Sequence, residues 1–172
     1  VVGMGAIGQS VVQRLQGFEV DTVGVRYTPE KGGPTDEVYG YDRIAEAVAD
    51  AAYVVLACPL TDATEGLVDR EVFRTMDPEA VLVNVARGGV VDTDDLVYAL
   101  RWNSIRGAAL DVTDPEPLPA DHDLWSFENV LITPHNAGHT PAYFERLADI
   151  VAEAVTTAEA SGEWTDLPNQ VV

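Results

Sequence analysis

Short apolar runs alternate along the chain with longer segments in which apolar residues recur at helical spacing. Runs of four or five mostly Val, Leu and Ile residues are typical of strands, whereas apolar residues three or four apart are typical of amphipathic helices. We therefore predict strands at residues 1–2, 22–26, 53–57, 81–85, 108–112 and 130–133. We predict helices at residues 6–16, 44–49, 70–76, 93–102 and 141–160.

Strands that alternate with helices indicate a parallel sheet with helices on both faces. The fold class that this order predicts is α/β: a Rossmann-type doubly wound parallel sheet in three layers, α/β/α. The inner strands YVVLA and VLVNV are apolar throughout, as expected of strands buried on both faces. The residues that the first helix is expected to bury are Ile7, Val11, Val12 and Leu15. Residues 30–37, EKGGPTDE, are expected to form a flexible loop.

The charge of the chain is unusual for a folded protein. It has 172 residues, the size of one ordinary domain, with 29 Asp and Glu against 10 Lys and Arg, a net charge of -19. The acids are spread between apolar segments, so they predict a solvated surface adapted to high salt, where the Debye length shrinks to ~3 Å near 1 M. We expect a halophilic protein that does not bind nucleic acid, because a polyanion would be repelled.

No apolar run approaches the ~20 residues that span a bilayer, so no membrane partner is expected. Cys58 is the one cysteine, and no leader-like segment opens the sequence, so we expect a cytoplasmic protein without disulfides. Residues 1–2 are too few for the first strand of such a sheet. We therefore expect that the chain opens inside this strand and that upstream residues have been removed.

Residues 3–8, GMGAIG, form a G-x-G-x-x-G pattern between a predicted strand and a predicted helix. In that context Gly3 permits the tight turn, Gly5 lets the backbone approach a pyrophosphate, and Gly8 allows close helix packing. The helix start, with Ala6 and Ile7, adds free N–H groups and a partial positive charge. The pattern predicts dinucleotide binding; the alternative is an ordinary glycine turn.

The residue that ends the second strand of such a fold reads the adenosine ribose of the cofactor. An acidic residue there would pair with the 2′-hydroxyl of NAD, but this chain has Arg26. A guanidinium suits a 2′-phosphate, so NADP is favoured over NAD. The alternative is that Arg26 only covers the adenine while NAD binds.

Three further segments, NVARGG, LDVTDPEP and TPHNAGH, each lie where a predicted parallel strand ends, the edge at which open α/β sheets bind ligands. They carry Arg87, Glu116 and His135 in addition to Asp111. A guanidinium can bind the carboxylate and ketone of a 2-oxo acid, and an imidazole can supply a proton near neutral pH. Each residue also has a structural alternative when it is taken singly. Arg87 could satisfy backbone carbonyls, Glu116 could be a solvated charge, and His135 could be bonded to the backbone.

These motifs, together with CPLTDATEGLV and in this order, resemble the D-isomer-specific 2-hydroxyacid dehydrogenase family over nearly the whole chain. The acidity makes it resemble a haloarchaeal-like member. The resemblance implies that Arg87 binds the substrate, that His135 is the acid and base, and that Glu116 is the carboxylate behind it. It also implies cofactor contacts from residues after the later strands: Cys58, Pro59, Thr64, Val85, Ala86, Asp111, His135 and Gly138.

Two of these residues have open or competing readings. Asp111 resembles the family's contact to the nicotinamide carboxamide or to a neighbouring backbone site, and the alternative is a simple capping carboxylate. Cys58 is expected to be a small buried residue rather than a nucleophile.

No metal site is predicted, because Gly138 makes a helical pairing of His135 and His139 doubtful and no third ligand has a matching spacing.

The resemblance further implies that residues 1–172 are the NAD(P)-binding domain of a longer enzyme, whose upstream substrate domain is absent. Residues from about 140 to 172 are then expected to pack beside that absent domain. The implied enzyme reduces 2-oxo acids such as glyoxylate or hydroxypyruvate, and is a homodimer through the cofactor domain. The alternative is a dinucleotide-sensing regulatory or corepressor-like domain, which would need no acid and base set.

Overall fold

The structure is a computed structural model that describes residues 1–165 and 167. The chain divides into two compact units, Val1–Ala137 and Gly138–Val172. The second unit contains one long helix, α5 (Tyr143–Ser161), which is followed by Gly162 in the left-handed conformation. Within the described residues, no helix is both long enough and apolar enough to cross a membrane.

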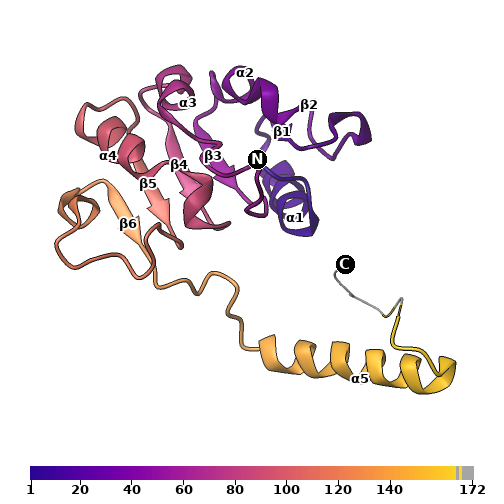
Figure 1. Ribbon diagram of the computed structural model, residues 1–172. Helices are drawn as coiled ribbons and strands as arrows, with labels where there is room; N and C mark the ends of the chain where they lie inside the picture. The colour runs from indigo at the N-terminus through magenta and orange to yellow at the C-terminus, as the bar shows by residue number, and fades with distance from the viewer. Residues whose placement is uncertain (166, 168–172) are drawn as a thin grey trace. The chain divides into compact units, whose positions relative to one another are not determined.

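The first unit is built on a parallel sheet. Its strands are β1 (Val23–Val25), β2 (Glu37–Tyr39), β3 (Tyr53–Leu56), β4 (Val81–Asn84), β5 (Gly107–Leu110) and β6 (Val130–Ile132). Val2 bridges Val25 of β1 on one side and Leu56 of β3 on the other, which joins the two ladders. The order is therefore β2, β1, Val2, β3, β4, β5, β6 (Figure 1), and it confirms the predicted Rossmann-type fold.

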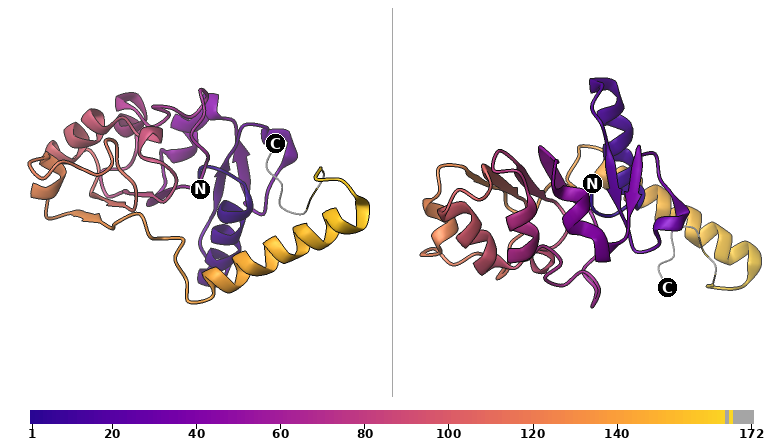
Figure 2. Two further views of the ribbon diagram at one scale, coloured as in Figure 1. Left: turned by 60° about the horizontal axis from the view of Figure 1, so that its bottom comes forward. Right: turned by 90° about the horizontal axis from the view of Figure 1, so that it is seen from above.

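Helices cover both faces of this sheet. They are α1 (Ala6–Leu15), α2 (Ile44–Val48), α3 (Arg70–Thr75) and α4 (Thr93–Arg101). In Figures 1 and 2, α2, α3 and α4 lie along one face and α1 lies on the other. The carboxylates of Asp69 and Asp92 cap α3 and α4 by accepting from the backbone N–H groups of Val72 and Asp95. Short 3-10 turns connect the elements: η1 (Gln16–Phe18), η2 (Pro29–Lys31), η3 (Tyr41–Arg43), η4 (Gly88–Val90) and η5 (Asp123–Ser126).

The core lies between the sheet and the layer of α2, α3 and α4. Leu56 and Leu82 of the inner strands are fully buried, as are Phe73 of α3 and Leu96 and Leu100 of α4. Along β3 and β4, however, buried residues alternate with half-buried or exposed ones. The expectation that both faces of these strands are fully buried is therefore wrong for one face.

Two local expectations also need correction. β2 was not predicted, and residues 30–37 are not simply a loop, because η2 ends at Lys31 and β2 begins at Glu37. β2 has three residues that are half-buried or exposed, so it leaves no apolar pattern. Ile7 was expected on the buried face of α1, but it is 62% exposed; Val12 is the residue of that face that is buried.

Candidate active site

A cavity of about 380 Å³ opens where the chain reverses its direction of travel across the sheet. From Val2 the chain passes to β1 on one side, and it later returns to β3 on the other side. Folds of this kind bind ligands in the crevice at that reversal, outside the carboxyl ends of the strands. The residues that line the cavity are Ile7, Ala57, Cys58, Pro59, Leu60, Val85, Ala86 and Arg87.

The glycine loop borders this cavity and suits a phosphate group. Gly3 has φ +100, and a Cβ there would lie 2.6 Å from the backbone of Ala57 and Cys58. A Cβ on Gly8 would collide with the Gly3 carbonyl, whereas one on Gly5 would meet nothing within 4 Å. α1 starts directly after Gly5 with no side-chain cap and no acidic residue in its first turn. Open space beside free N–H groups at a helix start fits the pyrophosphate of a dinucleotide.

The loop after β3 brings the expected Cys58 and Pro59 to the cavity, together with Leu60, which was not expected. Leu60 directly follows Pro59 in the sequence, and this position was the signal that it could border the cavity. Burial raises the pKa of the Cys58 thiol, in agreement with a small buried residue rather than a nucleophile. Thr64 is buried under the loop, where its hydroxyl donates to the Pro59 carbonyl at 2.6 Å and accepts from the Thr61 amide at 2.8 Å. Thr64 therefore shapes the loop.

Arg26 lies directly after β1, at the expected adenosine end of the site. Its Nη1 donates to the Gly32 carbonyl at 2.5 Å, which ties the side chain to the loop after η2. The half-buried Tyr41 was not expected here, because it follows the unpredicted strand β2. Burial raises the pKa of Tyr41, and the centroid of its ring lies 6.4 Å from the ring centroid of Tyr27, the residue after Arg26. Tyr41 therefore lies near the segment that follows β1.

His135 and Glu116, which are 19 residues apart, meet at the same edge of the sheet. Nδ1 of His135 lies 2.8 Å from Oε1 of Glu116, and the two side chains are 49% and 39% exposed. The backbone of His135 is left-handed, with φ +51, and its N–H donates to the Thr133 carbonyl at 3.0 Å. Because Nδ1 engages Glu116, Nε2 is the ring nitrogen that can exchange a proton with a ligand.

Asp111, at the end of β5, holds the segment that carries His135. Its carboxylate accepts from the hydroxyl of Thr133 at 2.5 Å and from the backbone N–H groups of Asn136 at 3.0 Å and Ala137 at 2.8 Å. Burial alone would raise the pKa of Asp111, but these hydrogen bonds and the interaction with His135 outweigh it and lower the pKa. These contacts match both the neighbouring backbone site and the capping carboxylate, and a contact of Asp111 to the nicotinamide carboxamide stays a prediction.

Arg87 follows β4, borders the cavity, and is exposed. Its Nη1 donates to the carbonyl of Ala86 at 2.6 Å. The buried Asn84 shapes this turn: its Oδ1 accepts from the Ala86 N–H at 3.0 Å and its Nδ2 donates to the Arg87 carbonyl at 3.0 Å. Asn84 was not expected as a site residue, although a polar residue at the end of an apolar strand, three residues before Arg87, was a signal. Gly138 belongs to the second unit, so its contact to the cofactor stays a prediction.

Arg87, Glu116 and His135 thus follow three neighbouring strands, β4, β5 and β6, at one edge of a sheet that also holds the glycine loop. This arrangement defines a dinucleotide-binding domain in which Arg87 lines the cavity, and Glu116 and His135 follow the next two strands of the same sheet edge. Residues 1–137 match the family model for the NAD binding domain of D-isomer specific 2-hydroxyacid dehydrogenases. The chain belongs to this family, as its motifs indicated.

Curated relatives and solved structures agree. The chain is 40% identical over 138 residues to glyoxylate reductase/hydroxypyruvate reductase of Homo sapiens. The alignment covers 78% of this chain and 42% of that protein. It is 36% identical over 173 residues to D-3-phosphoglycerate dehydrogenase of Methanocaldococcus jannaschii, covering 98% of this chain and 33% of that protein. The chain therefore spans less than half the length of these relatives.

Among solved structures, the chain resembles a D-isomer specific 2-hydroxyacid dehydrogenase from Xanthobacter autotrophicus Py2 in complex with NADPH and MES. The TM-score is 0.84 at 31% identity, and the match covers 98% of this chain and 69% of that one. At this identity and TM-score the two proteins share the fold.

Proposed function

We propose that this chain is the cofactor-binding part of an enzyme that interconverts 2-oxo acids and D-2-hydroxy acids with NAD(P). The observation that carries the proposal is the 2.8 Å pair of His135 and Glu116 at the sheet edge that also holds the glycine loop. A binding module without turnover has no need for an imidazole held by a carboxylate at the sheet edge where the cofactor would bind.

The bound nicotinamide would supply or accept the hydride. In the proposed reaction the Arg87 guanidinium binds the substrate carboxylate and stabilises negative charge that develops on the ketone oxygen. Nε2 of His135 donates a proton to that oxygen during reduction and removes it during oxidation. Glu116 holds the ring through Nδ1, so that Nε2 keeps one orientation. Asp111 fixes the backbone on either side of His135.

Arg26 supports a preference for NADP over NAD. Its guanidinium is held by the Gly32 carbonyl at the end of β1, where a 2′-phosphate of the adenosine ribose would need a cation. Titration of the protein with both reduced cofactors tests the preference. Tighter binding of NADPH, lost in Arg26→Glu, is expected; at least equal affinity for NADH would contradict it and favour an arginine that only covers the adenine.

The remaining expectations stay predictions that rest on composition and on the family. The substrate is proposed to be a small 2-oxo acid such as glyoxylate or hydroxypyruvate, because relatives bear glyoxylate and hydroxypyruvate reductase names. A homodimer, a cytoplasmic location and the lack of nucleic acid or membrane partners are proposed alongside. Exposed apolar residues of α5, including Phe144 and Val151, support packing of residues 140–172 against a further domain.

A screen of the full-length protein tests the proposed function. NADH and NADPH are each offered with a panel of 2-oxo acids in concentrated salt, and cofactor oxidation is followed by absorbance. Oxidation that depends on one or more of the acids is expected. Tight cofactor binding without oxidation by any acid would instead favour the dinucleotide sensor.

A further inference from the structure

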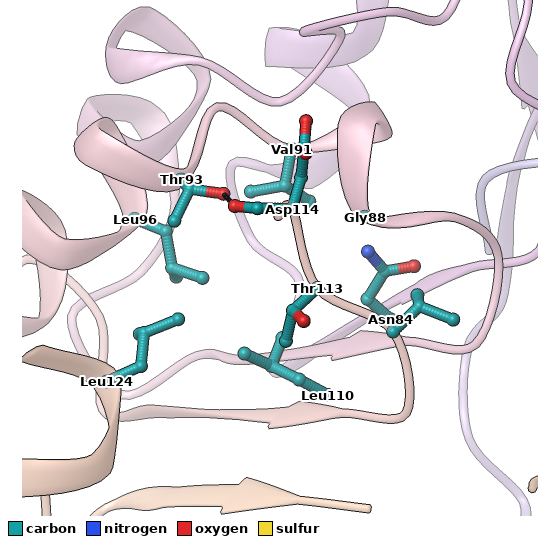
Figure 3. A pocket seen from close by; sticks show the side chains of 10 residues that line it. Asn84, Gly88, Val91, Thr93, Leu96, Leu110, Thr113, Asp114 and Leu124 are labelled. Carbon is teal, nitrogen blue, oxygen red and sulfur yellow. Dashed lines mark hydrogen bonds between the residues drawn. The ribbon is translucent and has the colours of Figure 1, made fainter. Parts of the chain in front are cut away.

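The loop that carries Arg87 and the loop that leads to Glu116 are joined by direct contacts of their own. They meet around a closely packed pocket lined by Asn84, Gly88, Thr93, Thr113 and Asp114, among others (Figure 3). The Thr93 hydroxyl donates to the Asp114 carbonyl at 2.8 Å. Beside this bond the backbones nearly touch, because a Cβ on Gly88 would collide with Thr113 and Asp114. The two loops therefore have one shared anchor point.

Thr93 belongs to a helix that is packed into the core. Thr93 is the first residue of α4, whose residues Leu96, Ala99 and Leu100 are buried in the core. The N-terminus of α4 is already capped by Asp92, whose carboxylate accepts from the Asp95 N–H at 2.9 Å. The Thr93 hydroxyl is thus not needed for the cap and is committed to the neighbouring loop.

The Arg87 end is fixed independently of Thr93. The Asn84 side chain accepts from the Ala86 N–H and donates to the Arg87 carbonyl, so it holds the backbone on both sides of the peptide bond between them. The Asn84 carbonyl also accepts from the Asp111 N–H at 2.9 Å, within the ladder of β4 and β5. The Asp114 carbonyl lies farther along the chain, beyond the end of β5, where no ladder holds the backbone. The Thr113 hydroxyl donates to the Pro115 carbonyl at 3.0 Å, but this bond joins the loop only to itself. The Thr93 hydroxyl ties the loop to α4.

We propose that Thr93 is a positioning residue, which sets the separation between the Arg87 guanidinium and the His135–Glu116 pair by holding the Asp114 carbonyl. Glu116 follows Asp114 by two residues and contacts His135 directly. A shift of the loop at Asp114 therefore moves Glu116, and with it the imidazole, relative to Arg87. The inference rests on the proposed function, because the separation matters only if one substrate engages both groups.

The test replaces the hydroxyl by a methyl group in the full-length protein. Thr93→Val should lower kcat with a 2-oxo acid about 3- to 10-fold, the loss expected for one neutral hydrogen bond that holds reacting groups in place. The KM for NADPH should stay within about two-fold, because no residue of the glycine loop moves. Thr93→Ser, which retains the donor, should restore kcat to near the wild-type value.

A matched control is Thr75→Val, because Thr75 also donates a hydroxyl to a backbone carbonyl, that of Val72 at 2.8 Å, away from the site. It should leave kcat unchanged. A second readout needs no turnover: the ¹⁵N shift of His135 Nδ1, which reports the hydrogen bond with Glu116, should move in Thr93→Val and return in Thr93→Ser.

The outcomes separate the two proposals. If the wild-type protein oxidises no cofactor with any 2-oxo acid, the proposed function fails, and the Nδ1 shift still decides whether Thr93 positions the pair. If the wild-type protein turns over but Thr93→Val keeps both kcat and the Nδ1 shift, the inference about Thr93 is overturned alone. Equal losses of kcat in Thr93→Val and Thr75→Val would reduce Thr93 to a purely structural residue.

Discussion

His135 adopts a backbone conformation that residues with a Cβ seldom adopt. Its φ of +51 is in the left-handed region, which costs roughly 1–2 kcal/mol for a residue other than glycine. Such strain persists only where surrounding contacts fix it, and it is common at functional sites. Here Asp111 provides the fixing contacts, because it binds Thr133 before and Asn136 and Ala137 after the strained residue.

Asp111→Asn tests this role. Asn keeps the size of the side chain but loses one acceptor and the charge, so we expect the free energy of unfolding to fall by about 1–2 kcal/mol. The pKa of Asp111 is lowered in the folded state, so its contribution is full above the ordinary carboxyl pKa of about 3.9 and disappears as pH falls through the lower folded pKa.

Urea denaturation of both proteins across the acidic range measures this contribution. The gap in stability between wild type and Asp111→Asn should be largest near neutral pH and should close in acid. A gap that is absent at neutral pH, or that widens in acid, would show that Asp111 does not anchor the loop.

At the residue scale the sequence was informative wherever a polar residue followed a strand of apolar residues. Arg87, Glu116 and His135 could be found in this way, because parallel strands end at one edge. The roles of Asn84 and Thr93 could not, because each depends on a backbone group that only the folded loops bring near. The same holds for Thr64, which lies beneath the loop that follows β3 rather than on its surface.

Among the elements, the glycine loop and α1 carry the cofactor cleft, and their glycines serve different needs. Gly3 has positive φ and no room for a Cβ, whereas Gly5, with φ -80, adopts an ordinary conformation beside open space. The fold therefore requires a glycine at position 3, whereas at position 5 we expect that only the bound ligand requires one.

A pair of substitutions separates these needs. Gly3→Ala should lower the free energy of unfolding by about 1–3 kcal/mol, because of backbone strain and the clash with Ala57 and Cys58. Gly5→Ala should leave stability unchanged or slightly higher, yet weaken NADPH binding by about ten-fold or more, because its Cβ would occupy the approach of the pyrophosphate. Thermal unfolding and fluorescence titration measure the two effects. Undiminished NADPH affinity in Gly5→Ala would place the pyrophosphate elsewhere.

The order of elements was predictable, but their edges and weakest members were not. β3, β4 and β5 are apolar runs between helical segments, and each appears within one or two residues of its predicted bounds. β2 is a three-residue edge strand stabilised by pairing with β1, and nothing in its own composition indicates it. Ile7 matched the apolar period of α1, but it faces the cavity because the helix starts at the ligand cleft.

For the whole molecule, the net charge of -19 is the dominant property. Repulsion among surface carboxylates opposes folding at low ionic strength, and salt screens it as the Debye length falls. We expect the melting temperature to rise by about 5 °C or more between about 0.1 M and about 2 M KCl. A triple variant, Glu19→Gln, Asp21→Asn and Glu30→Gln, changes three exposed acids and should show a smaller rise. A melting temperature that does not respond to KCl would contradict a halophilic adaptation.

The most direct test of the proposed chemistry compares wild type with His135→Asn in the full-length protein. Asn tolerates the left-handed backbone at this position but cannot serve as a proton donor near neutral pH. NADPH oxidation with a 2-oxo acid should slow by about 10²- to 10⁴-fold, while the Kd for NADPH stays within about two-fold. Turnover at the wild-type rate in His135→Asn would remove the imidazole from the reaction and contradict the proposal.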